Sequence, residues 1–251
     1  MAPRIALYHD DASGERYEEK AFKKTGTRYE KIGPREMVAE TLRKYDVLFL
    51  PGAFPLKTHN KGGFFAFLNF LKRIGGIYRN PILEYVNSGG GLVAVCASVG
   101  AMGKGLSIPP HAKPFTLGFK PIGLFDFHAR YGPKTGVVDL APVDYEQPPD
   151  ARKVVREVLG DYSEERFSSL YFRGPLMTYD RRSEIIHPSL RDNRTEEVIV
   201  AKYMDEEPRM LGRGAISYKE YGEGKAISCS VHPEFSTWDL FDSMIDVVAR
   251  R

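Results

Sequence analysis

Hydrophobic positions along the chain fall into short apolar runs separated by amphipathic segments. "RIALY" (residues 4–8), "VLFL" (47–50) and "GLVAV" (91–95) are continuous apolar runs, which are typical of strands buried on both faces. Between them, "GPREMVAETLRKY" and "NPILEYVNSGG" carry apolar residues at helical spacing, with Pro34 in the first turn of one and Gly89 as the stop signal of the other. This order predicts right-handed βαβ units and a mostly parallel sheet.

The later part of the chain adds further elements to this sheet. Residues 107–168 are richer in glycine, proline and aromatic residues, and they predict short added strands and a helix near "ARKVVREVLG". "EEVIVAKY" predicts a strand, and a hairpin or meander is expected to turn at 222–224. "STWDLFDSMIDVVARR" predicts a closing helix, capped by Ser236 or Thr237. We expect one domain over 1–251, an α/β three-layer sandwich of flavodoxin-like type with an elaborated middle segment at about 107–168.

Composition narrows the class of protein. The 251 residues are 42% hydrophobic and 27% charged with a formal net charge of +3, so neither nucleic acid nor an acidic membrane surface is an expected partner. No stretch approaches the roughly 18 apolar residues of a membrane span, and the start is too polar for a signal peptide. Two cysteines do not form a disulfide framework, which favours a reducing, cytoplasmic location. Gln147 is the only glutamine, a depletion typical of heat-adapted proteins, and it suggests a thermophilic source.

Cys96 is the first candidate for chemistry. It directly follows the apolar run 91–95, and the small residues Ala97, Ser98 and Gly100 come after it. A tight strand-to-helix turn with small neighbours is how a nucleophile is presented at the carboxyl end of a parallel strand. A helix beginning there would favour the thiolate, and the Ala97 amide would supply one oxyanion donor. The alternative is a packed thiol, because unpaired cysteine is among the residues most often buried.

The second candidate piece is "SVHPE" near the C-terminus. Pro233 restricts His232 to an extended backbone, so the side chain of Glu234 points to the same side as the imidazole and can fix its tautomer. Together with Cys96, these residues provide the nucleophile, the base and the orienting carboxylate of covalent catalysis. Taken by itself, a lone histidine at a strand end is more often structural.

Three motifs in order, "LFLPGA", "GGGLVAVCAS" and "SVHPE", resemble the class I glutamine amidotransferase-like superfamily. Within it, "RIALYHDDAS", "ILEYVNSGGGLVAVCAS", "IGLFDFHARYGP" and "SLYFRGPLM" resemble the branch named for the N-terminal domain of biotin–protein ligase. The resemblance covers about residues 4–234. It implies Cys96 as nucleophile, His232 as base and Glu234 as orienting carboxylate, and it places the other oxyanion amide in the turn of Gly52 and Ala53.

The chain also departs from the superfamily pattern. Gly100 stands where glutamine amidotransferases carry a glutamine, and Ala97 stands where the related intracellular proteases carry a histidine. Neither glutaminase nor protease activity is therefore expected, and a biotin ligase would need a further catalytic domain. Two hypotheses stay open: a cysteine-dependent amidase or hydrolase of a small carbonyl substrate, or a non-catalytic binding or regulatory module. Neither requires a cofactor or a metal, both take a small molecule as partner, and a homodimer is compatible with either.

Several further residues are second-line candidates. The loop "FRGPLM", which contains Gly174, could close over a substrate, and Arg173 could bind a carboxylate. Ser98, beside the thiol, is a further possible substrate-binding residue. Cys229 is expected to be a core thiol. Ordinary polar loop roles are the better interpretation of the remaining polar residues near the expected site: Asp10, Asp11, His59, His128 and Arg130.

Overall fold

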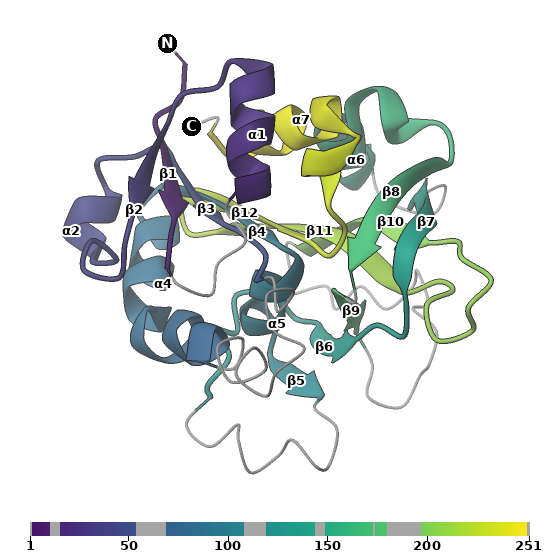
Figure 1. Ribbon diagram of the computed structural model, residues 1–251, viewed down its shortest axis with the longest axis horizontal. Helices are drawn as coiled ribbons and strands as arrows, with labels where there is room; N and C mark the ends of the chain where they lie inside the picture. The colour runs from purple at the N-terminus through teal and green to yellow at the C-terminus, as the bar shows by residue number, and fades with distance from the viewer. Residues whose placement is uncertain are drawn as a thin grey trace.

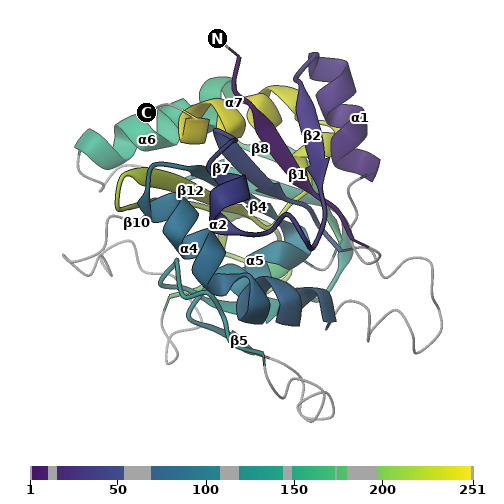
Figure 2. The same ribbon diagram turned by 90° about the vertical axis from the view of Figure 1, so that its left-hand side faces the viewer.

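A computed structural model describes residues 2–10, 16–53, 69–107, 119–143, 149–172, 174–179 and 197–249. The chain forms three layers, in which a twisted central sheet separates two groups of helices (Figure 1). Helices α1, α6 and α7 cover one face of the sheet, and α4 and α5 cover the other, as the turned view shows (Figure 2). This is the α/β sandwich expected from the sequence.

The order of the strands positions the candidate site. The strands are β1 (Ile5–Tyr8), β2 (Tyr29–Ile32), β3 (Val47–Leu50), β4 (Gly91–Val95), β5 (Gly105–Ser107), β6 (His128–Tyr131), β7 (Thr135–Pro142), β8 (Phe167–Phe172), β9 (Pro175–Thr178), β10 (Glu197–Tyr203), β11 (Gly214–Tyr221) and β12 (Gly224–Cys229). The α-helices are α1 (Arg16–Thr25), α2 (Ala39–Leu42), α4 (Arg79–Asn87), α5 (Val99–Met102), α6 (Pro149–Leu159) and α7 (Trp238–Ala249).

The sheet has a parallel part and an antiparallel part. Strands β2, β1, β3, β4 and β12 are neighbours in that order and run parallel, as the βαβ pattern predicts. From β12 the order continues antiparallel through β11, β10, β7 and β8. The hairpin between β11 and β12 turns at Gly222, whose φ of 62° suits glycine. The sheet therefore grows from a parallel centre by an antiparallel extension.

The core consists of the apolar strands and the inner faces of the helices. Strands β1, β3 and β4 are buried at every position, as expected for strands covered on both faces. In α7 the buried side chains recur at helical spacing and include Leu240, Phe241, Met244 and Ile245. On α1, Phe22 packs against the rings of Phe49 and Phe241, which joins this helix to both the sheet and α7.

One helix is shorter than the sequence predicts, and the helix behind Cys96 is short as well. The helix expected from Pro34 is limited to α2, because a local turn forms first: the Gly33 amide donates to Glu36 Oε2 at 2.9 Å, and the Glu36 amide donates to the Gly33 carbonyl. Behind Cys96 the chain makes a 3-10 turn and then only the four residues of α5. That helix ends at Gly103, where a Cβ would lie 2.4 Å from the Phe127 carbonyl oxygen.

Candidate functional site

The candidate site lies where β3, β4 and β12 end side by side. Leu50 pairs with Ala94, and Val95 pairs with Cys229, so the residues that follow these three strands emerge at one edge of the sheet. The turn of Gly52 follows β3, Cys96 follows β4 and His232 follows β12. Ligand sites of parallel α/β sheets are found at this carboxyl edge.

Cys96 has an unusual backbone conformation. Its φ of 49° is the one positive value of a non-glycine residue among those the structure describes. A side chain in this left-handed region costs about 1–3 kcal/mol, so surrounding contacts must hold it there. The residue begins the 3-10 turn Cys96–Ser98 and is 5% exposed. The strand, strained residue and turn are the arrangement of a nucleophile elbow.

His232 and Glu234 form a buried pair. The imidazole Nδ1 lies 2.5 Å from Glu234 Oε1, and both side chains are hidden from solvent. His232 precedes Pro233 with φ −115° and ψ 77°, outside the extended conformation that the sequence predicts, and Glu234 lies in the 3-10 turn Pro233–Phe235 that follows. The His232 amide donates to the Leu170 carbonyl at 2.8 Å. Trp238 Nε1 donates to the Glu234 carbonyl and ties this turn to α7. The pair is therefore held by β8 on one side and α7 on the other.

The electrostatics of His232 depend on its two partners. Burial alone lowers the pKa of the imidazole, but the charges of Cys96 and Glu234 and the hydrogen bonds with both raise it well above its ordinary value. These two groups therefore favour the protonated ring over the neutral one. Since Nδ1 faces Glu234, Nε2 is the ring nitrogen available to the thiol.

Gly52 lies in contact with both Cys96 and His232. A Cβ at this position would lie 3.2 Å from Cys96 Cβ and 3.3 Å from His232 Cε1. Only glycine leaves the thiol and the imidazole their present places. The buried hydroxyl of Ser98 donates to the Pro51 carbonyl at 2.6 Å, which fastens the cysteine turn to the Gly52 turn. Ala53 and Ala97 are buried beside them.

Glu18 is a site residue that the sequence patterns did not reveal. It projects from α1, is 0% exposed, and its Oε1 accepts a hydrogen bond of 3.2 Å from the Gly52 amide. Oε2 is buried with no hydrogen-bond partner among the described residues. Burial and the charge of Glu234 raise the pKa of Glu18 well above its ordinary value, against the opposing effects of His232 and of the backbone amides.

Aromatic rings surround the imidazole. The ring centroids of Phe172 and Phe235 lie 5.0 and 5.7 Å from that of His232, both at edge-to-face angles. On the thiol side, burial raises the pKa of Tyr131 and Tyr171, and the nearby charge of Cys96 adds to both shifts. The groups of the site thus meet in apolar, aromatic surroundings, where electrostatic interactions are stronger than in water.

Most of the other sequence candidates have packing or hydrogen-bonding partners of their own. Gly174 packs against the Ser230 carbonyl oxygen, 2.3 Å from where its Cβ would be, and its own carbonyl accepts from Tyr171. Asp10 is held by Tyr8 and by Arg73 at 3.1 Å. Cys229 is fully buried, which raises the pKa of its thiol. His128 begins β6, and Arg130 follows in the same strand. Three candidates lie outside the described residues: Asp11, His59 and Arg173.

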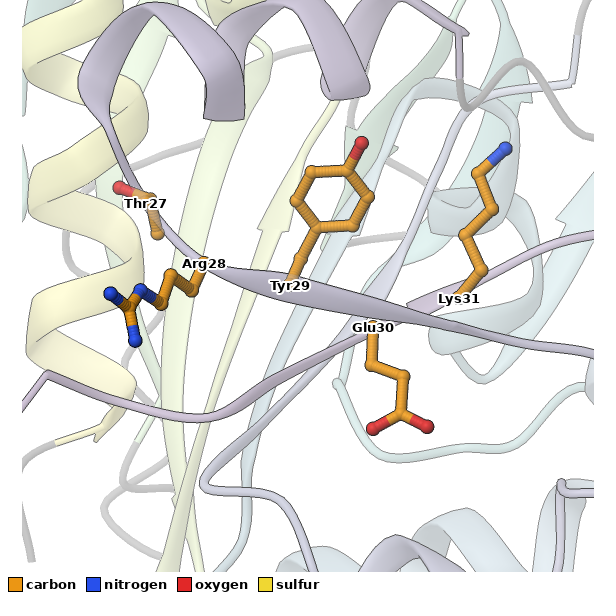
Figure 3. Close-up of a pocket in the computed structure, with 5 residues that line it drawn as sticks. All are labelled: Thr27, Arg28, Tyr29, Glu30 and Lys31. Atoms are coloured by element: carbon orange, nitrogen blue, oxygen red, sulfur yellow. The ribbon is translucent and has the colours of Figure 1, made fainter.

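Surface hollows offer a contrast to this buried site. One of about 670 Å³ follows the edge strand β2, where it is lined by residues 27–31. Tyr29 and Lys31 lie on the side of α1, and Glu30 points the other way (Figure 3). Strands β1 and β3 separate this edge from β4 and Cys96. Charged side chains along an edge strand are a common protection against pairing with another chain.

Within the described ranges, no three His, Cys, Asp or Glu side chains are placed together as metal ligands would be. Among the helices that the structure describes, none has the length and apolar character to cross a membrane.

No protein-family model matches the chain, and no curated protein matches its sequence. Solved structures do match over nearly the whole length. A "putative gmp synthase subunit a protein" from Thermoplasma acidophilum has a TM-score of 0.57 at 12% identity, covering 99% of this chain and 95% of that one. A "Putative thua-like protein" from Bacteroides uniformis has a TM-score of 0.51 at 14% identity, with 98% and 92% covered. A cytoplasmic protein from Salmonella typhimurium has a TM-score of 0.52 at 10% identity, with 98% and 100% covered.

These likenesses define the class of fold. The chain is an α/β protein with the flavodoxin-like, glutamine amidotransferase-like fold. At 10–14% identity the comparisons show the fold, and they do not show an activity.

Proposed function

We propose that this protein is a cysteine-dependent hydrolase of small carbonyl compounds, amides or esters. The observation that carries the proposal is the junction at Gly52, where a strained Cys96 and the hydrogen-bonded pair of His232 and Glu234 converge. Each role of covalent catalysis is then filled by a side chain of suitable chemistry.

The reaction would proceed in two halves. Cys96 Sγ bonds to the carbonyl carbon, and the carbonyl π pair moves to oxygen. When the oxyanion collapses, the bond to the leaving amine or alcohol breaks, and His232 Nε2 gives that group its proton. Water then attacks the thioester and loses a proton to Nε2, the C–S bond breaks, and the acid departs. Glu234 keeps Nδ1 occupied throughout, so that Nε2 is the atom that transfers the proton.

Glutamine is a poor candidate for the substrate. Where amidotransferases carry a glutamine, Gly100 lies among Leu71, Leu106 and Pro175, each 3.6–3.7 Å from the place of a Cβ. A small neutral carbonyl compound agrees better with such surroundings. The relation to biotin–protein ligase N-terminal domains, the cytoplasmic location and a dimeric state belong to the same proposal and rest on the sequence patterns.

The competing function is binding without turnover. It is favoured by the burial of the candidate groups, since Cys96 is 5% and His232 0% exposed, and by the missing glutamine. A module of this kind would keep the fold and use the same corner to hold a ligand. Thiol reactivity distinguishes the two functions.

The test is alkylation of Cys96 by iodoacetamide as a function of pH. If His232 stabilises the thiolate, labelling at about pH 6.5 is expected to be about 10-fold faster than in the His232→Ala variant. Cys96→Ser removes the labelled site, and Cys229→Ser is the matched control for the other buried thiol. Equal labelling with and without His232, at the pH dependence of an ordinary thiol, would favour the binding module. Amides, esters and glutamine are then screened for turnover.

A further inference from the structure

The Gly52 amide is already engaged within the protein. It donates to Glu18 Oε1, so this N–H is not directed at a substrate oxygen in the present arrangement. An amide proposed to stabilise an oxyanion therefore has the Glu18 carboxyl group in front of it.

The second oxygen of Glu18 is the informative atom. A carboxylate oxygen buried without a partner is costly, and native proteins rarely leave one in place without a functional reason. The charged groups that face Glu18 are Glu234, which repels an anion, and the His232 imidazolium, whose charge Glu234 and Cys96 already compensate. A neutral carboxylic acid has the opposite property, because it can donate the hydrogen bond that a carboxylate cannot.

We infer that Glu18 is a fourth catalytic residue, which donates a hydrogen bond from its carboxylic acid Oε2 to the carbonyl oxygen of the substrate as that oxygen becomes negative. Gly52 acts behind it, since its amide holds Oε1 and orients the acid. This inference rests on the proposed hydrolase and names the donor of its oxyanion site. In other enzymes, a carboxylic acid kept neutral by apolar surroundings serves in the same way.

The arrangement explains why a glutamate sits on the apolar face of α1. Phe22 and Ala21, one turn further along the helix, are buried in the core, so Glu18 enters the same interior. Tyr17 packs against Phe235 at a centroid distance of 4.5 Å, which fixes the start of the helix against the turn that carries Glu234. The carboxyl group is thus positioned by packing before any substrate arrives.

Two reactions of the same thiol separate this role from a structural one. Alkylation by iodoacetamide displaces iodide and forms no oxyanion, whereas acylation by p-nitrophenyl acetate does. In Glu18→Leu, acylation is expected to fall by about 100-fold, the usual effect of losing one oxyanion donor, while alkylation changes by less than about 3-fold. Glu18→Gln keeps a neutral donor and should retain most of the acylation rate.

The ratio of acylation to alkylation cancels the ionisation of Cys96 itself. In the native protein this ratio should fall as pH rises and Glu18 loses its proton, whereas in Glu18→Gln it should stay constant. An equal loss of both reactions in Glu18→Leu, an unchanged acylation rate, or a ratio independent of pH in the native protein would each overturn the inference.

Circular dichroism checks that the variants fold. If Glu18→Leu does not fold, the pH profiles of the native protein and of the isosteric Glu18→Gln decide the matter. Failure of the hydrolase proposal would be seen in a different measurement. In that case the rate at which iodoacetamide alkylates Cys96 would be the same with and without His232.

Discussion

Two buried glutamates in this molecule have opposite surroundings. Glu197, at the start of β10, is 8% exposed and has partners on both oxygens: Tyr179 donates to Oε1 and the Asp126 amide to Oε2, each at 2.6 Å. Glu18 is 0% exposed and has the Gly52 amide on one oxygen and, within the described part of the chain, no partner on the other. Burial raises the pKa of both residues, that of Glu197 to about 7.

The difference separates a structural carboxyl group from one available for chemistry. Around Glu197 the network is closed, because Tyr179 also contacts Ser217, and Asp126 is paired with Lys219 at 3.0 Å and with Lys104. A closed network stabilises the fold and has no place for a ligand. The open oxygen of Glu18, beside the turn of Gly52, has no such partner among the described residues, and this is the oxygen that our proposal assigns to the substrate.

The largest effect is expected when each glutamate is replaced by leucine. Glu197→Leu leaves the Asp126 amide unpaired and removes the Tyr179 bond, so the free energy of unfolding should fall by about 3 kcal/mol. Glu18→Leu also leaves one amide, that of Gly52, without a partner, but it removes an unsatisfied carboxyl oxygen and should cost less than about 1.5 kcal/mol. Urea denaturation at about pH 6 measures both variants. Equal losses would remove the distinction between the two sites.

A smaller effect concerns the pH dependence of stability. The folded-state pKa of Glu197, about 7, lies above its value in the unfolded chain, so its contribution is full at low pH and is lost as pH rises through 7. Between about pH 6 and pH 8 the native protein should lose about 1.4 kcal/mol from this residue. Glu197→Gln keeps the shape of the side chain and abolishes this part of the slope. Glu18→Gln should reduce the slope in the same direction.

A steeper loss of stability with rising pH in Glu197→Gln than in the native protein would contradict the assignment. Glu220→Gln is a suitable control, because Glu220 lies in the neighbouring strand β11 and its side chain accepts from Tyr218 at 2.8 Å, outside the network of Glu197.

The sequence predicted those parts of the molecule that depend on local pattern. Strand β3 runs from Val47 to Leu50 as expected, and the hairpin turns at Gly222, because unbroken apolar runs and glycine turns are decided within a few residues. The positions of Cys96, His232 and Glu234 at one edge followed from strand order combined with a family resemblance. Their catalytic roles stay a prediction until the thiol is tested.

Glu18 shows what local pattern did not reveal. The signal was present in "RYEEKAFKK", where an acidic residue shares the helical face of Ala21 and Phe22. An isolated polar residue on an apolar face is ambiguous, however, because its partner can come from any distant segment. Here the partner is Gly52, 34 positions away, and only the packing of α1 beside β3 brings them together. The start of α2 was predicted too early for a similar reason, since the Glu36 side chain accepts from the Gly33 amide and holds a turn where the helix was expected to begin.

The smallest effect belongs to a third glutamate, which is not buried in this way. Glu19 follows Glu18 on α1 but reaches the edge strand β2, where it pairs with Lys31 and accepts from Tyr29 at 3.4 Å. The Lys31 side chain is 41% exposed, so water replaces most of what the ion pair supplies. Lys31→Met should change the free energy of unfolding by less than about 0.5 kcal/mol, and about 1 M salt should have little further effect on the variant. A loss as large as that of Glu197→Leu would mean that burial and closure of the network do not govern how much a carboxyl group contributes in this fold. Glu18 and Glu19, neighbours on the same helix, would then differ in role for a reason other than solvent exposure.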